Sequence, residues 1–395
     1  MNCLCGFGVG ENGGVCLSDP DPDVNHVKAW EDAGESPITH YVISFLSFES
    51  TPDGIRIRTD PGEIWNVPAG STTDFALHPN LRAALASAKT HGKKIMLSIG
   101  GEVGSSGFVG WRNAVGVDGM RAELERVTAA FAEANGFEAD GIDVDIELGG
   151  YYDYASDKYQ ATRDLIDAIP ERFLVAFVPQ VGNGLCAAPE VGDALNPQKA
   201  LGGQCQQPDG DDAPWILARL DQDCTRKDGS PKLDYFGIQY YNAGQAECCG
   251  GGSSPEAQVA SALQNYKNLA NGWPAFDAED DPESPFYDYR FYPGPWVAFD
   301  GIGAERLVLG KPGCQGCAGS NYLGLDSMHT LLGQLDHRLD APMGGILFWD
   351  LCRLFGNVGP QCVSGTCQPS WGGPDILGNL TGLRTRMAGL EQRAP

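Results

Sequence analysis

The stretch ADGIDVDIELGG, from Ala139 to Gly150, is the part of the sequence that decides the fold. Three acids alternate in it with three aliphatic residues: Asp143, Asp145 and Glu147 with Ile142, Val144 and Ile146. Side chains alternate between the two faces of a strand, so the acids share one face and the aliphatic residues share the other. Such a strand either lies at the surface of an antiparallel sheet with its acids in water, or carries carboxylates into the interior.

The segments around this stretch favour the second interpretation. Apolar runs bounded by Gly, Pro or Asp predict seven strands: 41–48, 93–101, 141–147, 172–180, 233–242, 306–313 and 344–351. Apolar stripes at helical spacing lie between or after them: Leu81/Leu85/Ala88, Leu124/Val127/Phe131, Val259/Leu263/Tyr266/Leu269, Met328/Leu332/Leu335/Leu339 and Ile376/Leu380/Leu383/Met387/Leu390. Strands that alternate with helices indicate an α/β fold with a parallel sheet.

The fold class that we predict is a closed (β/α)8 TIM barrel. The N-terminal NCLCGFGVG (residues 2–10) is a weak candidate for the eighth strand. An open, doubly wound sheet is the alternative, but no Gly-rich phosphate-binding fingerprint follows the first strand. We expect residues 1–395 to form a single catalytic domain with long disulfide-tied loops at 181–231, 274–301 and 356–374.

Composition excludes some classes of partner. The formal net charge is −25, whereas a nucleic acid or an anionic membrane surface requires clustered Lys and Arg. No stretch of the sequence is as long and apolar as a transmembrane helix. We therefore expect neither nucleic acid nor membrane as a partner, and a monomer that needs no cofactor.

The 13 cysteines indicate an oxidising compartment. Many lie in Gly- and Pro-rich contexts: Cys3, Cys5, Cys248, Cys249, Cys314, Cys317, Cys362 and Cys367. Zinc is the rival interpretation, since Cys314 and Cys317 have ligand-like spacing, but no second pair or nearby His pair accompanies them. We expect a secreted protein with no metal site, whose leader is not present in this numbering.

In a barrel, the acid strand would direct its aliphatic residues towards the helices and its acids into the lumen. Burial of carboxylates costs free energy and raises their pKa values. A raised pKa does not help the chain to fold, but it keeps a carboxyl group protonated and able to donate its proton near neutral pH. Glu147 comes last, at the carboxyl end where barrel active sites form, and is the candidate general acid. Calcium binding is less compatible, because Ile and Val stand where a calcium loop has Gly and flexible polar residues. Asp140 is out of phase and is expected to brace the strand end.

The motifs resemble glycoside hydrolase family 18, and in particular its hevamine-like, class III branch. DGIDVDIE (140–147) fits the family's DxxDxDxE signature and SIGG (98–101) resembles its SxGG strand. Further segments resemble the family's other strands, in the right order: GFGVGENGG (6–14), FVPQ (177–180), QYYN (239–242), LGKPG (309–313) and GGILFWD (344–350).

This resemblance implies retaining hydrolysis of β-1,4-linked N-acetylglucosamine, in which the substrate's own acetamido oxygen attacks and an oxazolinium intermediate forms. It implies that Glu147 is the general acid and base, that Asp145 holds the acetamido N–H, and that Asp143 shares a proton with Asp145. Tyr241 would orient the acetamido group.

The substrate-binding residues that the resemblance implies are Phe45, Gln180, Gln239, Asn242 and Trp349. Trp349 would form the floor of the subsite and Phe45 a wall, although an aromatic residue in a strand is more often part of the core. Non-proline cis peptides are expected at Ser44–Phe45 and Trp349–Asp350. Ser98 is expected to fill the lumen below the carboxylates.

The function that follows is an endo-acting chitinase whose substrates are chitin or N-acetylglucosamine oligosaccharides. An endo-β-N-acetylglucosaminidase acting on N-glycan cores is an alternative with the same chemistry. A non-catalytic chitooligosaccharide-binding lectin is an alternative from another class, and the intact Asp143, Asp145 and Glu147 row argues against it.

Overall fold

The computed structural model describes residues 2–7, 28, 31–34, 36, 38–51, 54–59, 64–65, 74–147, 157–179, 214–241, 255–272, 300–312, 322–339, 341–349, 362–363 and 366–367. The predicted helical stripe at 376–390, the cysteines at 248, 249, 314 and 317, and residues 273–299 of the predicted loop 274–301 lie outside these residues.

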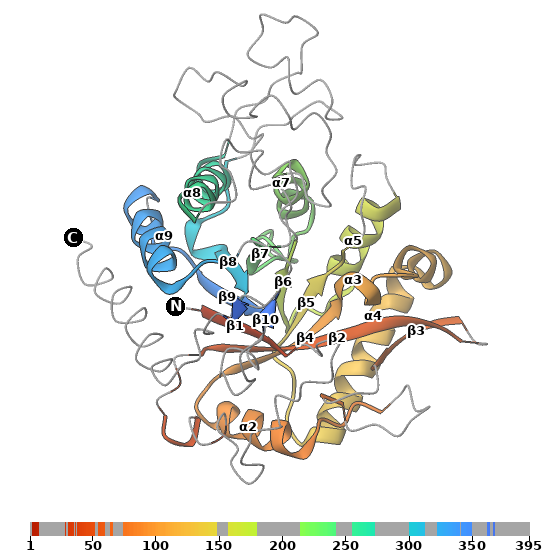
Figure 1. Ribbon diagram of the computed structural model, residues 1–395. Helices are drawn as coiled ribbons and strands as arrows, with labels where there is room; N and C mark the ends of the chain where they lie inside the picture. Colours follow the sequence, from red (N-terminus) through yellow and green to blue (C-terminus); the bar gives the residue numbers. More distant parts are fainter. Residues whose placement is uncertain are drawn as a thin grey trace, which may run out of the picture.

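Eight parallel strands in the described residues form a closed ring: β1 (Asn2–Phe7), β2 (His40–Thr51), β4 (Lys94–Gly100), β5 (Gly141–Asp145), β6 (Leu174–Phe177), β7 (Tyr235–Gln239), β8 (Leu307–Pro312) and β9 (Gly345–Trp349). Each pairs with the next along the chain, and β1 pairs with both β2 and β9 (Figure 1). The closed TIM barrel is therefore confirmed over the open sheet, and the weak N-terminal candidate is the strand that closes it.

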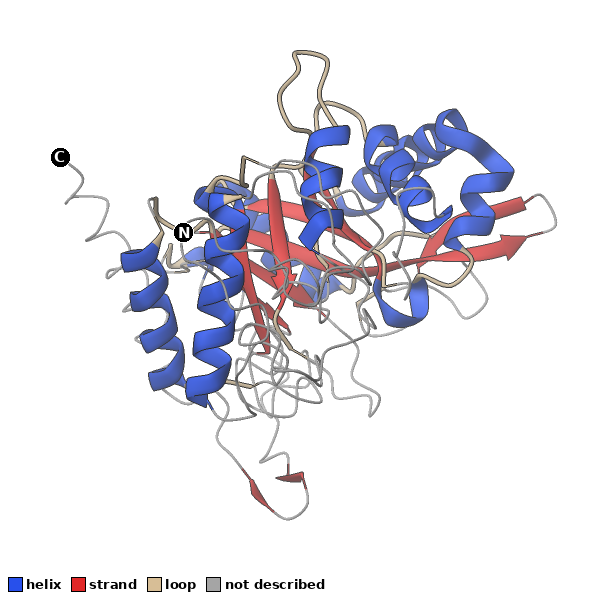
Figure 2. Ribbon diagram, turned by 90° about the horizontal axis from the view of Figure 1, so that it is seen from above, coloured by secondary structure: helices blue, strands red, loops and turns tan. Residues whose placement is uncertain are grey.

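Helices surround the ring of strands (Figure 2). The described ones are α2 (Pro79–Thr90), α3 (Gly101–Gly104), α4 (Phe108–Asn135), α5 (Asp157–Ala168), α7 (Pro214–Asp223), α8 (Pro255–Asn271) and α9 (Leu325–Arg338), with a 3-10 turn, η3 (Ala304–Arg306), before β8. Pro79 opens α2, where its missing N–H costs nothing. Gly116 has non-helical angles and kinks α4. In this part of the chain, no helix is long and apolar enough to cross a membrane.

The core has two layers, as the alternation along each strand requires. Ile142, Val144 and Ile146 belong to the large buried cluster between strands and helices. A second cluster lies inside the ring and draws on neighbouring strands: Val42, Met96, Ala176, Val178, Tyr235, Val308 and Leu347. The lumen is thus filled with side chains, and the acids of β5 share it.

Three features differ from the prediction. An additional strand, β3 (Gly54–Thr59), pairs antiparallel with β2 and forms a hairpin that projects beyond the barrel (Figures 1 and 2). Residues 214–223, which the sequence reading included in a loop, form α7. In the predicted 356–374 loop, β10 (Cys362–Val363) and β11 (Thr366–Cys367) form a short antiparallel pair.

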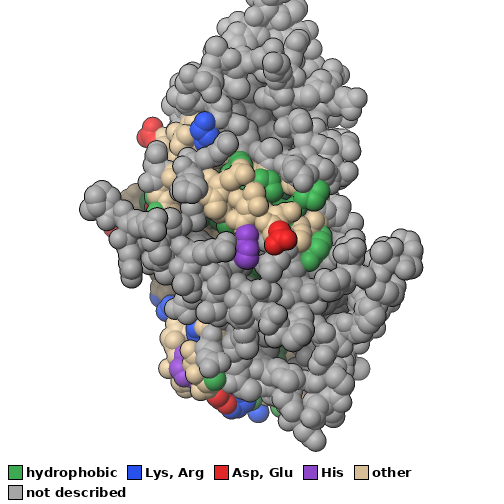
Figure 3. Space-filling model, turned by 60° about the vertical axis from the view of Figure 1, so that its left-hand side comes forward, with side chains coloured by type: hydrophobic (Ala, Val, Ile, Leu, Met, Phe, Trp, Pro, Cys, Tyr) green, Lys and Arg blue, Asp and Glu red, His purple; other side chains and the backbone are tan. Residues whose placement is uncertain are grey.

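The face drawn in Figure 3 shows described side chains of both charges. On the face drawn in Figure 3, Lys and Arg side chains of the described residues lie towards the upper and lower ends and do not gather into one broad patch. The absence of nucleic acid among the partners stays a prediction.

Candidate active site

The acid row of β5 enters the lumen and leaves only its outermost member partly exposed. Asp143 and Asp145 are buried, with 2% and 5% of their surface exposed. Glu147 lies two residues beyond the end of β5 and is half-buried. The three acids therefore run from the interior to the carboxyl end of the barrel, where a substrate can reach Glu147.

Asp143 is the deepest of the three acids. Ser98 Oγ, on the neighbouring strand β4, donates a hydrogen bond of 2.5 Å to Asp143 Oδ2, and Oδ1 is buried without a hydrogen-bond partner. Burial raises the pKa of Asp143 to about 7, against the lowering effect of the Ser98 hydrogen bond. Asp143 thus hydrogen bonds Ser98 rather than Asp145, and the shared proton stays a prediction.

The raised pKa of Asp143 predicts a pH-dependent loss of stability. A carboxyl whose pKa is about 3.9 unfolded and about 7 folded binds its proton more tightly in the folded protein. Its stabilising contribution is complete below about pH 4, declines as the pH rises, and is lost above about pH 7. Between pH 4 and 7, wild type should lose about 3 kcal/mol of unfolding free energy more than Asp143→Asn does.

Urea unfolding across this pH range measures the difference. Asp118→Asn is the matched control, because the Asp118 side chain is 99% exposed. Parallel pH curves for wild type and Asp143→Asn would show that Asp143 does not take up its proton on folding.

Gln239, the last residue of β7, holds Asp145 in place. Gln239 Nε2 donates to Asp145 Oδ1 at 2.7 Å and to Val178 O at 3.1 Å, and lies 3.4 Å from Glu147 Oε1. Because a carboxamide nitrogen carries two N–H donors, the shorter bonds to Asp145 and Val178 can form together. Gln239 therefore holds Asp145 and lies beside Glu147.

Two aromatic side chains form a partly exposed pair: Phe45 lies in the middle of β2, where its pairing with β4 becomes irregular, and Trp349 is the last residue of β9. The rings of Phe45 and Trp349 are stacked, with centroids 5.5 Å apart and an angle of 25° between planes. Both remain half-buried, while the adjacent Leu46 and Phe348 are buried in the core. The Ser44–Phe45 peptide is cis, as predicted. An aromatic pair of this kind suits the apolar face of a sugar ring.

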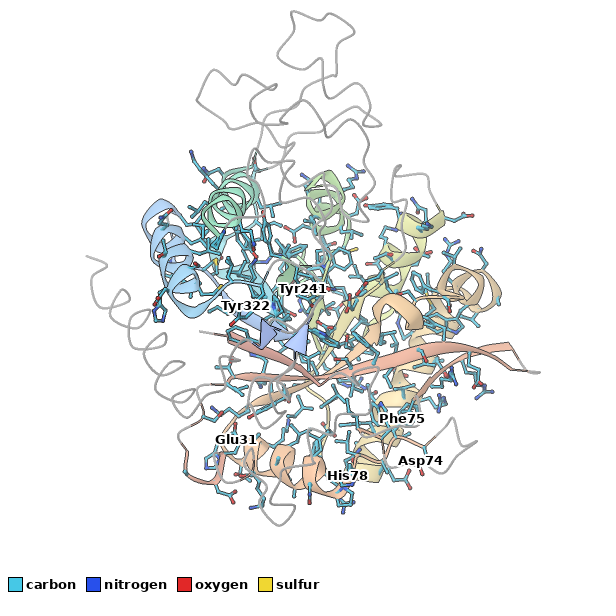
Figure 4. The ribbon with its side chains drawn as sticks, viewed as in Figure 1. Glu31, Asp74, Phe75, His78, Tyr241 and Tyr322 are labelled. Atoms are coloured by element: carbon cyan, nitrogen blue, oxygen red, sulfur yellow. The ribbon has the colours of Figure 1, made fainter. Side chains whose placement is uncertain are left out.

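Of the remaining predicted site residues, the structure describes Tyr241 only. Tyr241 is the second residue after β7, is buried, and lies near the middle of the barrel in the view of Figure 4. Gln180 and Asn242 lie outside the described residues, and so does Asp350 of the predicted second cis peptide.

Two consecutive glycines allow the strand ends to approach one another. Gly100 has φ +119°, and a Cβ placed on it would lie 2.0 Å from the backbone oxygen of Asp145. Gly101 has φ +73°, and a Cβ there would lie 2.8 Å from the Phe45 ring. The two glycines of the SIGG motif are therefore required at this site because a side chain at either position would clash with a neighbouring strand.

Ser105 is a site residue that the sequence reading missed. It is fully buried just after the one-turn helix α3, and its Oγ accepts a hydrogen bond of 2.9 Å from the backbone N–H of Glu147. The sequence signal for Ser105 was its position shortly after SIGG. Nothing in the local sequence relates Ser105 to Glu147, which lies 42 positions later.

Asp140 has the bracing role expected of it. It accepts hydrogen bonds from Lys89 Nζ at 2.7 Å and from the backbone N–H of Ile95 at 2.8 Å, and so ties β5 to α2 and β4. Among the residues that the structure describes, no group of three or more His, Cys, Asp or Glu side chains is arranged to hold a metal ion. The chemistry available in the described site is that of carboxyl groups, amides and aromatic faces.

Part of the chain, which includes β5, matches the model of a known family. Residues 23–187 match the family model described as "Glycosyl hydrolases family 18". No curated protein sequence matches the chain.

Solved structures are similar at low sequence identity. A GH18 chitinase from Pseudoalteromonas aurantia has a TM-score of 0.50 at 17% identity, over 89% of this chain and 95% of that one, and supports the fold. The chitinase ChiC from Aspergillus fumigatus has a TM-score of 0.47 at 16% identity, over 97% and 99%. The xylanase and α-amylase inhibitor protein XAIP-II from Scadoxus multiflorus has a TM-score of 0.46 at 16% identity, over 89% and 93%.

Proposed function

We propose that this chain is an endo-acting chitinase of glycosyl hydrolase family 18 that hydrolyses β-1,4-linked N-acetylglucosamine polymers with retention. The match of residues 23–187 to the model of that family supports the proposal. The observation that carries the proposal is the graded burial of the acid row, in which Asp143 and Asp145 are buried and Glu147 is half-exposed. A row with this gradient offers a proton donor at the mouth of the barrel, supported by acids that water cannot reach.

In the proposed mechanism, Glu147 gives its proton to the glycosidic oxygen as the bond to the anomeric carbon breaks. The 2-acetamido oxygen of the substrate attacks that carbon, so an oxazolinium ion forms and no enzyme carboxylate becomes a nucleophile, an exception to the usual pair of carboxylates. Glu147, now ionised, then takes a proton from the water that opens the ring. Asp145 holds the acetamido N–H and balances the positive charge that develops beside it.

The other residues position the sugar in this proposal. Tyr241 hydrogen bonds the acetamido oxygen, which is catalysis by orientation. Phe45 and Trp349 take the pyranose face on their partly exposed rings. Gln239 lines the same subsite with two residues outside the described part of the chain: Gln180 and Asn242.

The proposal extends to the kind of family member and its location. The order of the strand-end motifs supports the hevamine-like, class III branch, and no segment resembling the small α+β insertion of processive relatives was found in the sequence, which favours an open cleft and endo cleavage. The cysteine content supports a secreted protein, and we propose a monomer that uses no cofactor.

A substrate panel tests the proposal. Wild type and Glu147→Gln are incubated with chitin oligosaccharides and, separately, with a high-mannose glycopeptide. Shortening of the oligosaccharides by wild type alone is the expected result. Release of the glycan alone would replace chitinase with an endo-β-N-acetylglucosaminidase, and binding without turnover of either would indicate a lectin.

Asp145→Asn tests substrate assistance. The amide keeps the size of the side chain but cannot balance positive charge, so kcat should fall about 10²- to 10³-fold while the affinity for oligosaccharide changes much less. Steady-state kinetics with a chitin oligosaccharide and calorimetric binding to the inactive Glu147→Gln background separate the two effects. An unchanged kcat would mean that the acetamido group is not the nucleophile.

A further inference from the structure

The turn that follows β4 lies between two elements of the candidate site. It consists of α3 (Gly101–Gly104) and Ser105, and we call it the β4 turn. At its start, a Cβ on Gly101 would lie within 3.0 Å of three atoms of the Phe45 ring. Farther along, a Cβ on Gly104 would lie 3.1 Å from the Cβ of Ser47. The β4 turn is thus packed closely against the carboxyl-terminal part of β2.

The other side of the β4 turn contacts the end of the acid strand through Ser105. Ser105 Oγ donates to Gly101 O at 2.7 Å and accepts from the Glu147 backbone N–H at 2.9 Å. It also lies 3.4 Å from Asp145 O. One hydroxyl therefore connects the first residue of the turn to the backbone of the candidate general acid.

This connection matters because β5 ends before Glu147. Asp145 is the last residue of the strand, where it pairs with Gly100, so Glu147 is not held by the ladder of the sheet. Its backbone is held instead by a buried hydroxyl, and a buried N–H requires such a partner. A displacement of the Glu147 backbone would carry its carboxyl group away from the glycosidic oxygen.

We propose that Ser105 is a positioning residue for Glu147: through the β4 turn it fixes the carboxyl group of the general acid relative to the aromatic wall formed by Phe45. The inference rests on the proposed function, since it concerns how the general acid of that site is held in position. Ser105 itself touches no reacting atom. Its contribution is to kcat, because a general acid must lie within hydrogen-bond reach of the oxygen it protonates, and a shift of about 1 Å can cost about 10²-fold.

Ser105→Ala is the variant that tests the role, with Ser106→Ala as the matched control, because Ser106 is the next residue and is exposed. On a chitin oligosaccharide, Ser105→Ala should lower kcat by about 10- to 100-fold with KM changed less than about threefold. Ser106→Ala should match wild type in both constants. Ser105→Thr keeps the hydroxyl and should retain kcat within about fivefold.

Hydrogen exchange of the Glu147 amide provides a readout that does not need turnover. Exchange resolved to single residues should be at least about tenfold faster at Glu147 in Ser105→Ala, and unchanged in Ser106→Ala and Ser105→Thr. If Ser105→Ala is not recovered folded, the threonine variant decides, because the retained hydroxyl must preserve both the slow exchange and kcat.

The outcomes separate this inference from the proposed function. Faster exchange at Glu147 with an unchanged kcat would overturn the positioning role but leave the chitinase proposal intact. Unchanged exchange in Ser105→Ala would show that the hydrogen bond does not restrain Glu147. Absence of turnover by wild type on every substrate would overturn the proposed function and, with it, this role.

Discussion

Replacing Glu147 with glutamine should lower kcat for chitin oligosaccharides by about 10³- to 10⁴-fold and leave their binding nearly intact. The amide has almost the same shape as the carboxyl group, so the packing of the barrel mouth is preserved. It cannot give a proton to the glycosidic oxygen or take one from water, and both steps of the proposed mechanism depend on that exchange. The expected signature is a large effect on kcat with a small effect on affinity.

Initial rates and calorimetric titration on the same oligosaccharide check this result. Glu138→Gln is the matched control, because it removes the same charge from an exposed position. A Glu147→Gln protein that retains more than about a tenth of the wild-type kcat would show that another group protonates the leaving oxygen. Loss of binding in parallel with turnover would instead assign Glu147 a role in holding the substrate.

The strand and helix pattern of the barrel could be predicted because it is a local property of the chain. Buried parallel strands appear as apolar runs, and the helices between them as stripes at a spacing of three and four residues. The acid strand was predicted to end at Glu147 but ends at Asp145, since pairing with the neighbouring strands stops there. The apolar pattern continues through Ile146, and pattern alone does not mark the end of pairing.

The β2–β3 hairpin was missed because its stabilising contacts are distant in sequence. Ile57 in the middle of β3 is fully buried, its N–H donates to Glu123 Oε1 at 3.0 Å, and its carbonyl accepts from Arg126 Nη2 at 3.1 Å. Both partners are on α4, more than 60 positions later. They satisfy the free edge of the added strand, which would otherwise expose unpaired backbone groups.

In the candidate site too, the sequence predicted which residue types are present but not which groups they contact. The alternation of the acids predicted their common face, and the motifs indicated the aromatic pair, but neither indicated which group each acid contacts. Ser98 was expected only to fill space, yet it donates to Asp143. Gln239 and Ser105 contact Asp145 and Glu147 across 94 and 42 positions, so their roles depend on the closed barrel.

Gly100→Ala should have the largest effect on stability among the substitutions considered, and we expect it to lower the unfolding free energy by about 3–5 kcal/mol. The new Cβ would lie 2.0 Å from the backbone oxygen of Asp145 and 2.7 Å from its carbonyl carbon. Both atoms belong to the paired strand β5, so relief requires the two strands to separate where Asp145 must be held. The φ of +119° adds strain, because L residues rarely adopt it.

Gly136→Ala separates the steric effect from the conformational one. Gly136 also has a positive φ, +81°, at the end of α4, but a Cβ there would meet no atom within 4 Å. Its substitution should cost only about 1 kcal/mol, the penalty of the left-handed conformation. Urea unfolding followed by tryptophan fluorescence compares the two variants with wild type. We expect Gly100→Ala to lose activity, because the displaced end of β5 carries Asp145 and, two residues later, Glu147. Equal losses of stability in the two variants would mean that β4 and β5 can separate at Gly100 without penalty, and in that case Gly100→Ala would remain active.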